Sequence, residues 1–133
     1  MKKYYIPLIG QEDNQPCEII TEKLTNTCKI ELNFQEIHLK SESTDFFEAL
    51  CEIREQLEPW KLIPFCYGAS LNVYPSGMSR DMGSGLTAYK MAIGKHVNQD
   101  DLVSIFEQGY DIIPSYVAKQ KEFFSEWVTS ERT

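Results

Sequence analysis

The sequence lacks the close pairs of cysteine and histidine on which metal and redox sites are usually built. Its 133 residues contain four cysteines and two histidines, with no C-x-x-C pair and no histidine close to a cysteine. A four-ligand zinc site usually contains at least one close pair of ligands. We therefore predict no metal, no cofactor and four free thiols of the kind found in a reducing cytoplasm: Cys17, Cys28, Cys51 and Cys66.

Long hydrophobic runs are also missing. No apolar run approaches the roughly 20 residues that cross a bilayer. The opening segment, residues 1–9, contains a short apolar stretch that is interrupted by Pro7 and lacks a small-residue cleavage site. This pattern favours a first β-strand over a signal peptide, and we expect no association with a membrane.

Basic residues are few. The chain has 13 basic and 20 acidic residues and a formal net charge of −7. Residues 10–60 hold twelve acidic and four basic residues, whereas residues 61–99 hold four basic residues and a single acidic one. Because acidic surfaces repel the phosphate backbone, we expect no binding to nucleic acid. A chain of this charge attracts a basic protein instead.

The length and composition fit one globular domain. Hydrophobic residues make up 42% of the chain and charged residues 25%, which is the balance of a domain with its own core. No repeat or linker divides residues 1–133. The periodicity predicts a single α+β domain in the order βββ-α-ββ-αα, with a mostly antiparallel sheet and about three helices.

The first half of the chain has the clearer periodicity. Residues 2–9, 18–24 and 28–34 alternate like strands, and the last two are predicted to form a hairpin around residues 25–27. Ile37 and Leu39 then fall on the opposite parity, which indicates a bulge or a break near residues 35–36. Residues 44–58 are predicted to form an amphipathic helix, ended by Pro59, whose apolar stripe is Phe46, Leu50, Ile53 and Leu57.

The second half is less regular. Residues 61–74 and 86–93 are predicted to be extended and to form a hairpin with a long connection over residues 75–85. A short helix is expected over residues 100–108, and a final helix over residues 114–129, with Pro114 in its first turn. Three aromatic residues of that last helix are expected to pack on the sheet rather than to form an exposed docking stripe: Phe123, Phe124 and Trp127.

Residues 67–85 differ from the rest of the chain. They hold four of the seven glycines, four serines, Arg80 and Asp81. Glycine allows positive φ and close approach to a ligand, and loops on a rigid sheet commonly carry function. The candidate binding residues are therefore Tyr67, Ser76, Ser79, Arg80, Asp81, Gly83 and Gly85.

Two interpretations of these residues remain open. In the first, Arg80 clamps an anionic group or a partner, and the backbone N–H groups of Gly83 and Gly85 form an anion nest. In the second, Arg80 and Asp81 brace the turn and the glycines satisfy its geometry.

Familiar catalytic and nucleotide-binding motifs are not present. No G-K-[ST] follows the glycines, and their spacing is not that of a dinucleotide-binding fingerprint. His38 and His96 have no nucleophile paired with them in the sequence, and the spacing of Cys66 and His96 does not favour a dyad. We assign no catalytic residue.

The segment Y-P-S-G-M-S-R-D-M-G-S-G over residues 74–85, followed by Ala88 and Tyr89, resembles a segment of small uncharacterised bacterial proteins. The resemblance covers about sixteen residues and carries over no activity. It implies a bacterial cytoplasmic protein.

These features lead to one hypothesis and one alternative. The hypothesis is a non-enzymatic bacterial protein-binding domain, one form of which is an immunity-type protein that neutralises a toxin by covering it. The alternative is a small enzyme, or a small-molecule or anion-binding protein, that uses the loop at residues 67–85. A deep pocket at that loop would favour the alternative, and a flat or convex acidic face would favour the protein-binding domain.

Overall fold

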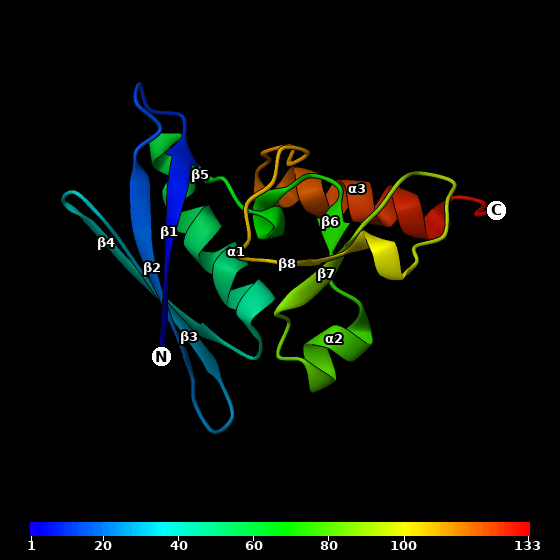
Figure 1. The fold of residues 1–133 in the computed structure, drawn as a ribbon, viewed down its shortest axis with the longest axis horizontal. Coiled ribbons are helices and arrows are strands. Elements are labelled where there is room, and N and C mark those ends of the chain that lie inside the picture. The colour runs from blue at the N-terminus through cyan, green and yellow to red at the C-terminus, as the bar shows by residue number, and fades with distance from the viewer.

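The computed structural model describes residues 1–133, which form two antiparallel sheets and three α-helices (Figure 1). The α+β class is thus confirmed. The larger sheet has the strand order β4-β3-β2-β1-β5, with β1 (Lys2–Ile9), β2 (Pro16–Lys23), β3 (Cys28–Phe34), β4 (Ile37–Ser43) and β5 (Ile63–Pro64). The smaller sheet has the order β6-β7-β8, with β6 (Val73–Tyr74), β7 (Thr87–Lys90) and β8 (Leu102–Ser104).

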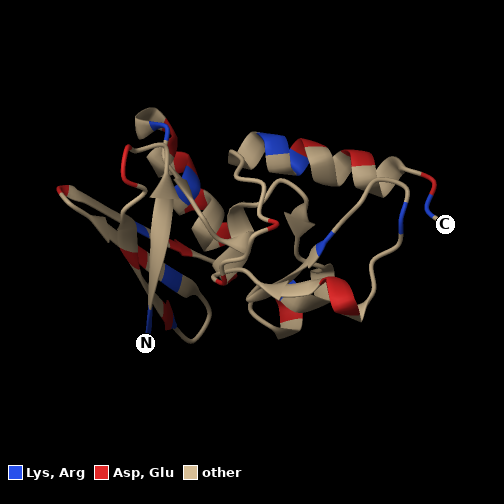
Figure 2. Ribbon diagram, turned by 45° about the horizontal axis from the view of Figure 1, so that its top comes forward, with Lys and Arg blue, Asp and Glu red and all other residues tan.

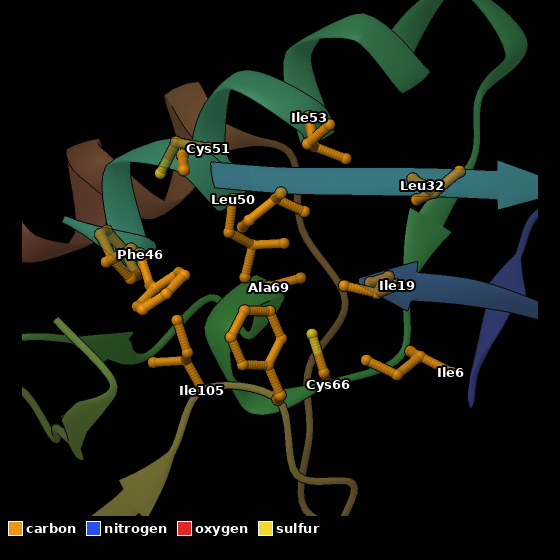
Figure 3. Packing of buried hydrophobic residues seen from close by; sticks show 14 of the residues in the cluster. Ile6, Ile19, Leu32, Phe46, Leu50, Cys51, Ile53, Cys66, Ala69 and Ile105 are labelled. Carbon is orange, nitrogen blue, oxygen red and sulfur yellow. The ribbon is translucent and has the colours of Figure 1, made fainter. Parts of the chain in front are cut away.

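Helix α1 (Phe46–Leu57) lies between the larger sheet and the second half of the chain (Figure 1). The predicted stripe is buried, and so are Phe47, Ala49, Cys51 and Arg54 beside it, while Glu55 and Gln56 are exposed. In the core, Leu50 and Ile53 lie among side chains from both halves of the chain (Figure 3), including Ile6, Ile19, Leu32, Cys66 and Ile105. The two halves therefore share one core around α1.

The chain reverses direction at residues 35–36. Phe34 pairs directly with Ile37, and Gln35 adopts a φ of 53°, so these residues form a two-residue hairpin turn. The opposite parity of Ile37 and Leu39 therefore results from a break between two strands and not from a bulge. It adds β4, a fourth strand before α1 that the predicted order βββ-α-ββ-αα omits.

Residues 100–108 do not form the predicted helix. Instead, a single turn of 3-10 helix, η3 (Gln99–Asp101), leads into β8. Strand β8 pairs with β7 through the Ala88–Val103 register, and Ile105 and Phe106 then enter the core. Pairing with β7 overrides the local apolar pattern, which had the spacing of a helix.

Residues 61–74 are not one extended strand, because β5 pairs with β1 in the larger sheet and a 3-10 turn, η2 (Tyr67–Ala69), follows it. The predicted hairpin is present only as the pairing of β6 with β7, and its long connection contains a helix. Helix α2 (Gly77–Met82) has six residues and projects away from the larger sheet (Figure 1). The helix count of three is therefore right, while the position of the second helix is not.

Helix α3 (Val117–Thr129) begins three residues later than predicted, because Pro114 is held in a β-bridge with Ser70. Its aromatic residues are half-buried. Phe124 stacks on Tyr74 with ring centroids 4.0 Å apart, and Trp127 Nε1 donates to the carbonyl of Lys95 at 2.8 Å. None of the helices combines the length and apolar character needed to span a membrane.

Candidate functional site

Arg80 of α2 is directed back into the molecule. Its Nη1 lies 3.2 Å from Asp45 Oδ2 and 3.7 Å from Glu48 Oε2. The guanidinium also lies over the rings of Phe47 and Tyr74, at 5.1 Å and 5.5 Å from their centroids. Arg80 therefore fixes α2 against the start of α1, which is the geometry of a brace.

Asp45 has a second role besides its ion pair with Arg80. Its Oδ1 accepts a hydrogen bond of 2.7 Å from the backbone N–H of Glu48, which makes Asp45 the N-cap of α1. The side chain of Asp45 is only 5% exposed. An N-cap of this kind satisfies a backbone donor that the helix leaves unpaired, so one carboxylate holds both helices.

The glycines of the loop satisfy its geometry. Gly85 has a φ of +69°, and a Cβ at this position would lie 2.8 Å from Asp45 Oδ1, so any other residue would be strained there. The N–H groups of Gly83 and Gly85 both donate to the carbonyl of Ser79, at 2.8 Å and 2.9 Å. Both N–H groups therefore already have an acceptor within the chain. Neither is free to bind an anion, as the anion-nest interpretation requires.

Ser76 and Ser79 attach α2 to its surroundings. Ser76 Oγ accepts from the backbone N–H of Ser79 at 3.0 Å and caps the helix. Ser79 Oγ lies 2.7 Å from the carbonyl of Thr87 on β7, to which it donates. The two hydroxyls therefore orient α2 relative to the smaller sheet.

Tyr67 belongs to a different network. It begins η2 (Tyr67–Ala69), and its hydroxyl donates to Asp111 Oδ1 at 2.5 Å, while Lys90 Nζ lies 3.0 Å from Asp111 Oδ2. The hydrogen bond to Asp111 raises the pKa of Tyr67 to about 12 and is the main reason that the pKa of Asp111 is lowered. Tyr67 is thus tied to the loop before α3 and does not join the Arg80 cluster.

The outer surface of α2 is apolar and exposed. Met78 and Met82 are 72% and 82% exposed, four residues apart and so on one side of the helix. They border an open hollow of about 300 Å³, whose other apolar lining residues are Tyr89 and Leu102. We call this surface the methionine surface, defined by Met78, Met82, Tyr89 and Leu102.

The acidic residue Asp81 is exposed between the two methionines and forms no ion pair. Asp100 and Asp101 of η3 directly precede Leu102. Figure 2 shows acidic residues on both α2 and η3, which lie along the same border of the molecule. The methionine surface is therefore flanked by carboxylates. Of the candidate residues predicted from the sequence, only Asp81 is exposed and has no hydrogen-bond or ion-pair partner for its side chain within the chain.

The methionine surface was missed in the sequence, although a signal for it exists. The chain has only four methionines, and two of them stand four positions apart inside the glycine-rich segment. Recognition of residues 77–82 as helical would have placed both on one side. A six-residue helix with glycine at its first position has too little periodicity for that.

Arg54 is a second residue that sequence reasoning missed. It is 2% exposed and has no carboxylate partner; its guanidinium donates to the carbonyls of Gly68 and Ser115 and to Gln120 Oε1. Burial lowers its pKa. Gln120 in turn donates to the carbonyls of Gly68, Ser70 and Val73. This pair holds the first part of the glycine-rich segment between α1 and α3.

Comparison of the chain with models of known protein families finds no match, and comparison with curated proteins finds none either. No group of three or more His, Cys, Asp or Glu side chains is placed to hold a metal ion. The function is therefore inferred from the geometry of the chain itself.

Proposed function

We propose that this chain is a non-enzymatic protein-binding domain and that the methionine surface is where it contacts its partner. The observation that carries the proposal is the contrast between the two sides of α2. The inner side is fixed by Arg80, Ser76 and Ser79, while Met78 and Met82 on the outer side stay exposed. Exposed apolar patches commonly mark interaction sites, and methionine adapts its shape to a partner.

In its most specific form, the proposal is a bacterial immunity-type protein that acts in the cytoplasm and neutralises a toxin by covering it. Three features support this form. The chain is small, its net charge is −7, and residues 74–89 resemble a segment of small bacterial proteins. The acidic charge favours rapid encounter with a basic protein and disfavours nucleic acid.

The alternative is an enzyme or a small-molecule binder that uses the loop at residues 67–85. The hollow beside α2 is the observation in its favour, because its volume of about 300 Å³ is that of the smallest ligand pockets. However, the hydroxyls of Ser76 and Ser79 that border it already have partners within the chain. The hollow is also open rather than deep, so we favour a protein partner.

The test compares the wild-type chain with the variant Met78→Glu/Met82→Glu as bait in the organism that encodes it. Both positions are exposed, so the variant should keep the melting temperature of the wild type, while a charged side chain in the contact should remove the partner. Tyr110→Glu is the matched control, because Tyr110 is 100% exposed and lies outside the hollow.

A partner retained by wild type and by Tyr110→Glu, but lost with the methionine variant, is the expected result. Expression of that partner alone should then inhibit growth, and co-expression of the wild-type chain should restore it. Equal capture by the methionine variant would remove the basis of the proposal, and growth inhibition that the chain does not relieve would exclude the immunity form.

A further inference from the structure

We infer that the methionine surface binds a basic amphipathic segment of its partner, whose apolar side chain fills the hollow while neighbouring Lys or Arg side chains meet the carboxylates around it. The inference rests on the proposed function, which it makes more specific by naming the chemistry of the partner. It is carried by three observations: the apolar lining of the hollow, the sign of the surrounding charge and the internal neutralisation of Arg80.

The centre of the surface suits an apolar side chain. Met78, Met82, Tyr89 and Leu102 all line the hollow, together with the polar residues Ser76, Ser79 and Thr87. Leu102 is 41% exposed in the absence of a partner. Burial of a Leu, Phe or Met side chain against such a surface is favourable, because it removes apolar area from water on both sides of the contact. The hollow holds about 300 Å³, which accommodates one or two side chains of a partner.

Acidic residues neighbour the surface on two elements, α2 and η3. Asp81 and Asp100 are exposed and form no ion pair, and Asp101 is in the same turn as Asp100. The lining of the hollow itself contains no charged residue of either sign. Carboxylates beside an apolar surface favour the approach of a cationic partner over an anionic one.

Arg80 is the single basic residue of α2 and does not alter this balance. Its guanidinium lies between Asp45 and Glu48, on the side of α2 that faces α1. The positive charge is therefore neutralised within the chain. A partner approaching from outside meets Asp81 and the methionines.

Two other occupants fit the same surface less well. A membrane with anionic lipids would be repelled by the carboxylates, because the binding of such membranes depends on Lys and Arg. A second copy of this chain in a symmetric contact would bring the same acidic border against itself. A basic protein segment satisfies both the apolar centre and the acidic border.

The experiment follows the methyl signals of the methionines by NMR while defined peptides are added to the whole chain. Met78 and Met82 report on the surface, whereas Met91 is buried and Met1 lies outside the hollow. Three helix-forming peptides of about 18 residues serve as probes. The first contains Leu and Lys in an amphipathic pattern, the second replaces each Lys with Glu, and the third keeps Lys and replaces each Leu with Ser.

We expect the Leu/Lys peptide alone to shift the Met78 and Met82 signals to saturation, with Met1 and Met91 unchanged. Its affinity should fall when the salt concentration rises from about 50 to about 300 mM, because salt screens the charge pairs. Asp81→Lys/Asp100→Lys should weaken binding about tenfold or more. Asp13→Lys, a charge reversal at an exposed acidic residue outside the hollow, should leave it unchanged.

Equal binding of the Leu/Glu peptide, or Leu/Lys binding that is unaffected by Asp81→Lys/Asp100→Lys, would overturn the inferred charge preference. So would the absence of any shift at Met78 and Met82 with all three peptides. These results would leave the proposed function standing if the captured partner were still lost with Met78→Glu/Met82→Glu. Retention of the partner by that variant would instead remove the proposed function itself.

Discussion

Arg54 on α1 and Gln120 on α3, 66 positions apart, are joined by a hydrogen bond of 2.6 Å between Nη1 and Oε1. Both are enclosed, at 2% and 0% exposure. The charge of Arg54 is surrounded by carbonyl and amide oxygens instead of a carboxylate. The stability of this arrangement depends on these hydrogen bonds, since Arg54 Nε is already buried without a partner and a buried charge that loses a further acceptor is strongly destabilising.

We therefore expect Gln120→Leu to lower the free energy of unfolding by about 3–5 kcal/mol. The substitution removes one acceptor of Arg54 and the donor to the carbonyls of Gly68, Ser70 and Val73. Arg54→Met/Gln120→Leu should be less destabilised than the sum of the two single variants, because the unpaired charge is then absent. Urea unfolding measures all three, with exposed Lys119→Ala as the control. Additive losses would contradict the coupling.

A second prediction concerns the ion pair between Arg80 and Asp45. Arg80→Ala should lower the free energy of unfolding by about 1–3 kcal/mol, because it leaves a nearly buried carboxylate without its partner. Arg80→Lys should recover part of this loss, since lysine keeps the charge but not the planar group over Phe47 and Tyr74. Asp81→Ala on the same helix is the control and should change stability by no more than about 0.5 kcal/mol. If the free energy of unfolding, measured by heat or urea, is unchanged in Arg80→Ala, Arg80 does not brace α2. The recognition role considered from the sequence would then be the better interpretation.

A third prediction concerns pH. Asp111 has a lowered pKa in the folded chain, so its contribution to stability is present above its unfolded pKa of about 4 and disappears as the pH falls through the folded value. Tyr67 has a pKa raised to about 12, so its contribution is complete below about pH 10 and is lost as the pH rises toward 12. The stability difference between wild type and Tyr67→Phe should thus be constant over the neutral range and shrink at both extremes.

The ultraviolet absorbance of tyrosinate tests this directly. Of the seven tyrosines, one should titrate near pH 12 in wild type, and that step should be missing in Tyr67→Phe. Tyr110→Phe, at a fully exposed residue, is the control and should leave the high-pH step in place. A high-pH step that survives in Tyr67→Phe would show that the step does not belong to Tyr67, and the absence of such a step in wild type would contradict the hydrogen bond to Asp111.

A fourth prediction concerns the cysteines. All four are buried free thiols, and burial raises the pKa of Cys17 to about 12 and those of Cys51 and Cys66 to about 11. Because the thiolate is the reactive form, a disulfide reagent should modify the native protein slowly and modify four thiols rapidly in denaturant. A thiol that reacts quickly in the native state would mean that its part of the core opens, and fewer than four in denaturant would contradict the free-thiol prediction.

The parts of the fold that could be predicted are those whose pattern is local. Strand alternation in residues 28–34 and the apolar stripe from Phe46 to Leu57 identify an element and its buried face directly. By contrast, β8 is a strand only because β7 lies beside it, and residues 102–106 read alone have the spacing of a helix. Contacts between distant segments decided the outcome there.

The candidate site was predicted as a region, and its internal roles were not. The glycines and serines of residues 67–85 indicated a shaped segment, but the partners that define their roles lie elsewhere in the chain. Arg80 meets Asp45, 35 positions away, and Tyr67 meets Asp111, 44 positions away. Side-chain pairs of this separation leave no periodic signal, so bracing and recognition could not be distinguished before the structure.

The contact between Asp45 and residues 80–85 has a consequence for folding. A six-residue helix is not stable by itself in water, so α2 depends on its contacts with the start of α1. Arg80 and Gly85 both contact Asp45. The carbonyl of Ser84 also accepts a hydrogen bond of 2.8 Å from the backbone N–H of Phe46. Partial opening of this contact would unwind α2 and separate Met78 from Met82 while the larger sheet stayed intact. Backbone amides of residues 79–83 should then exchange with solvent faster than those of β2 and β3, and only chains that have completed this closure would present the methionine surface.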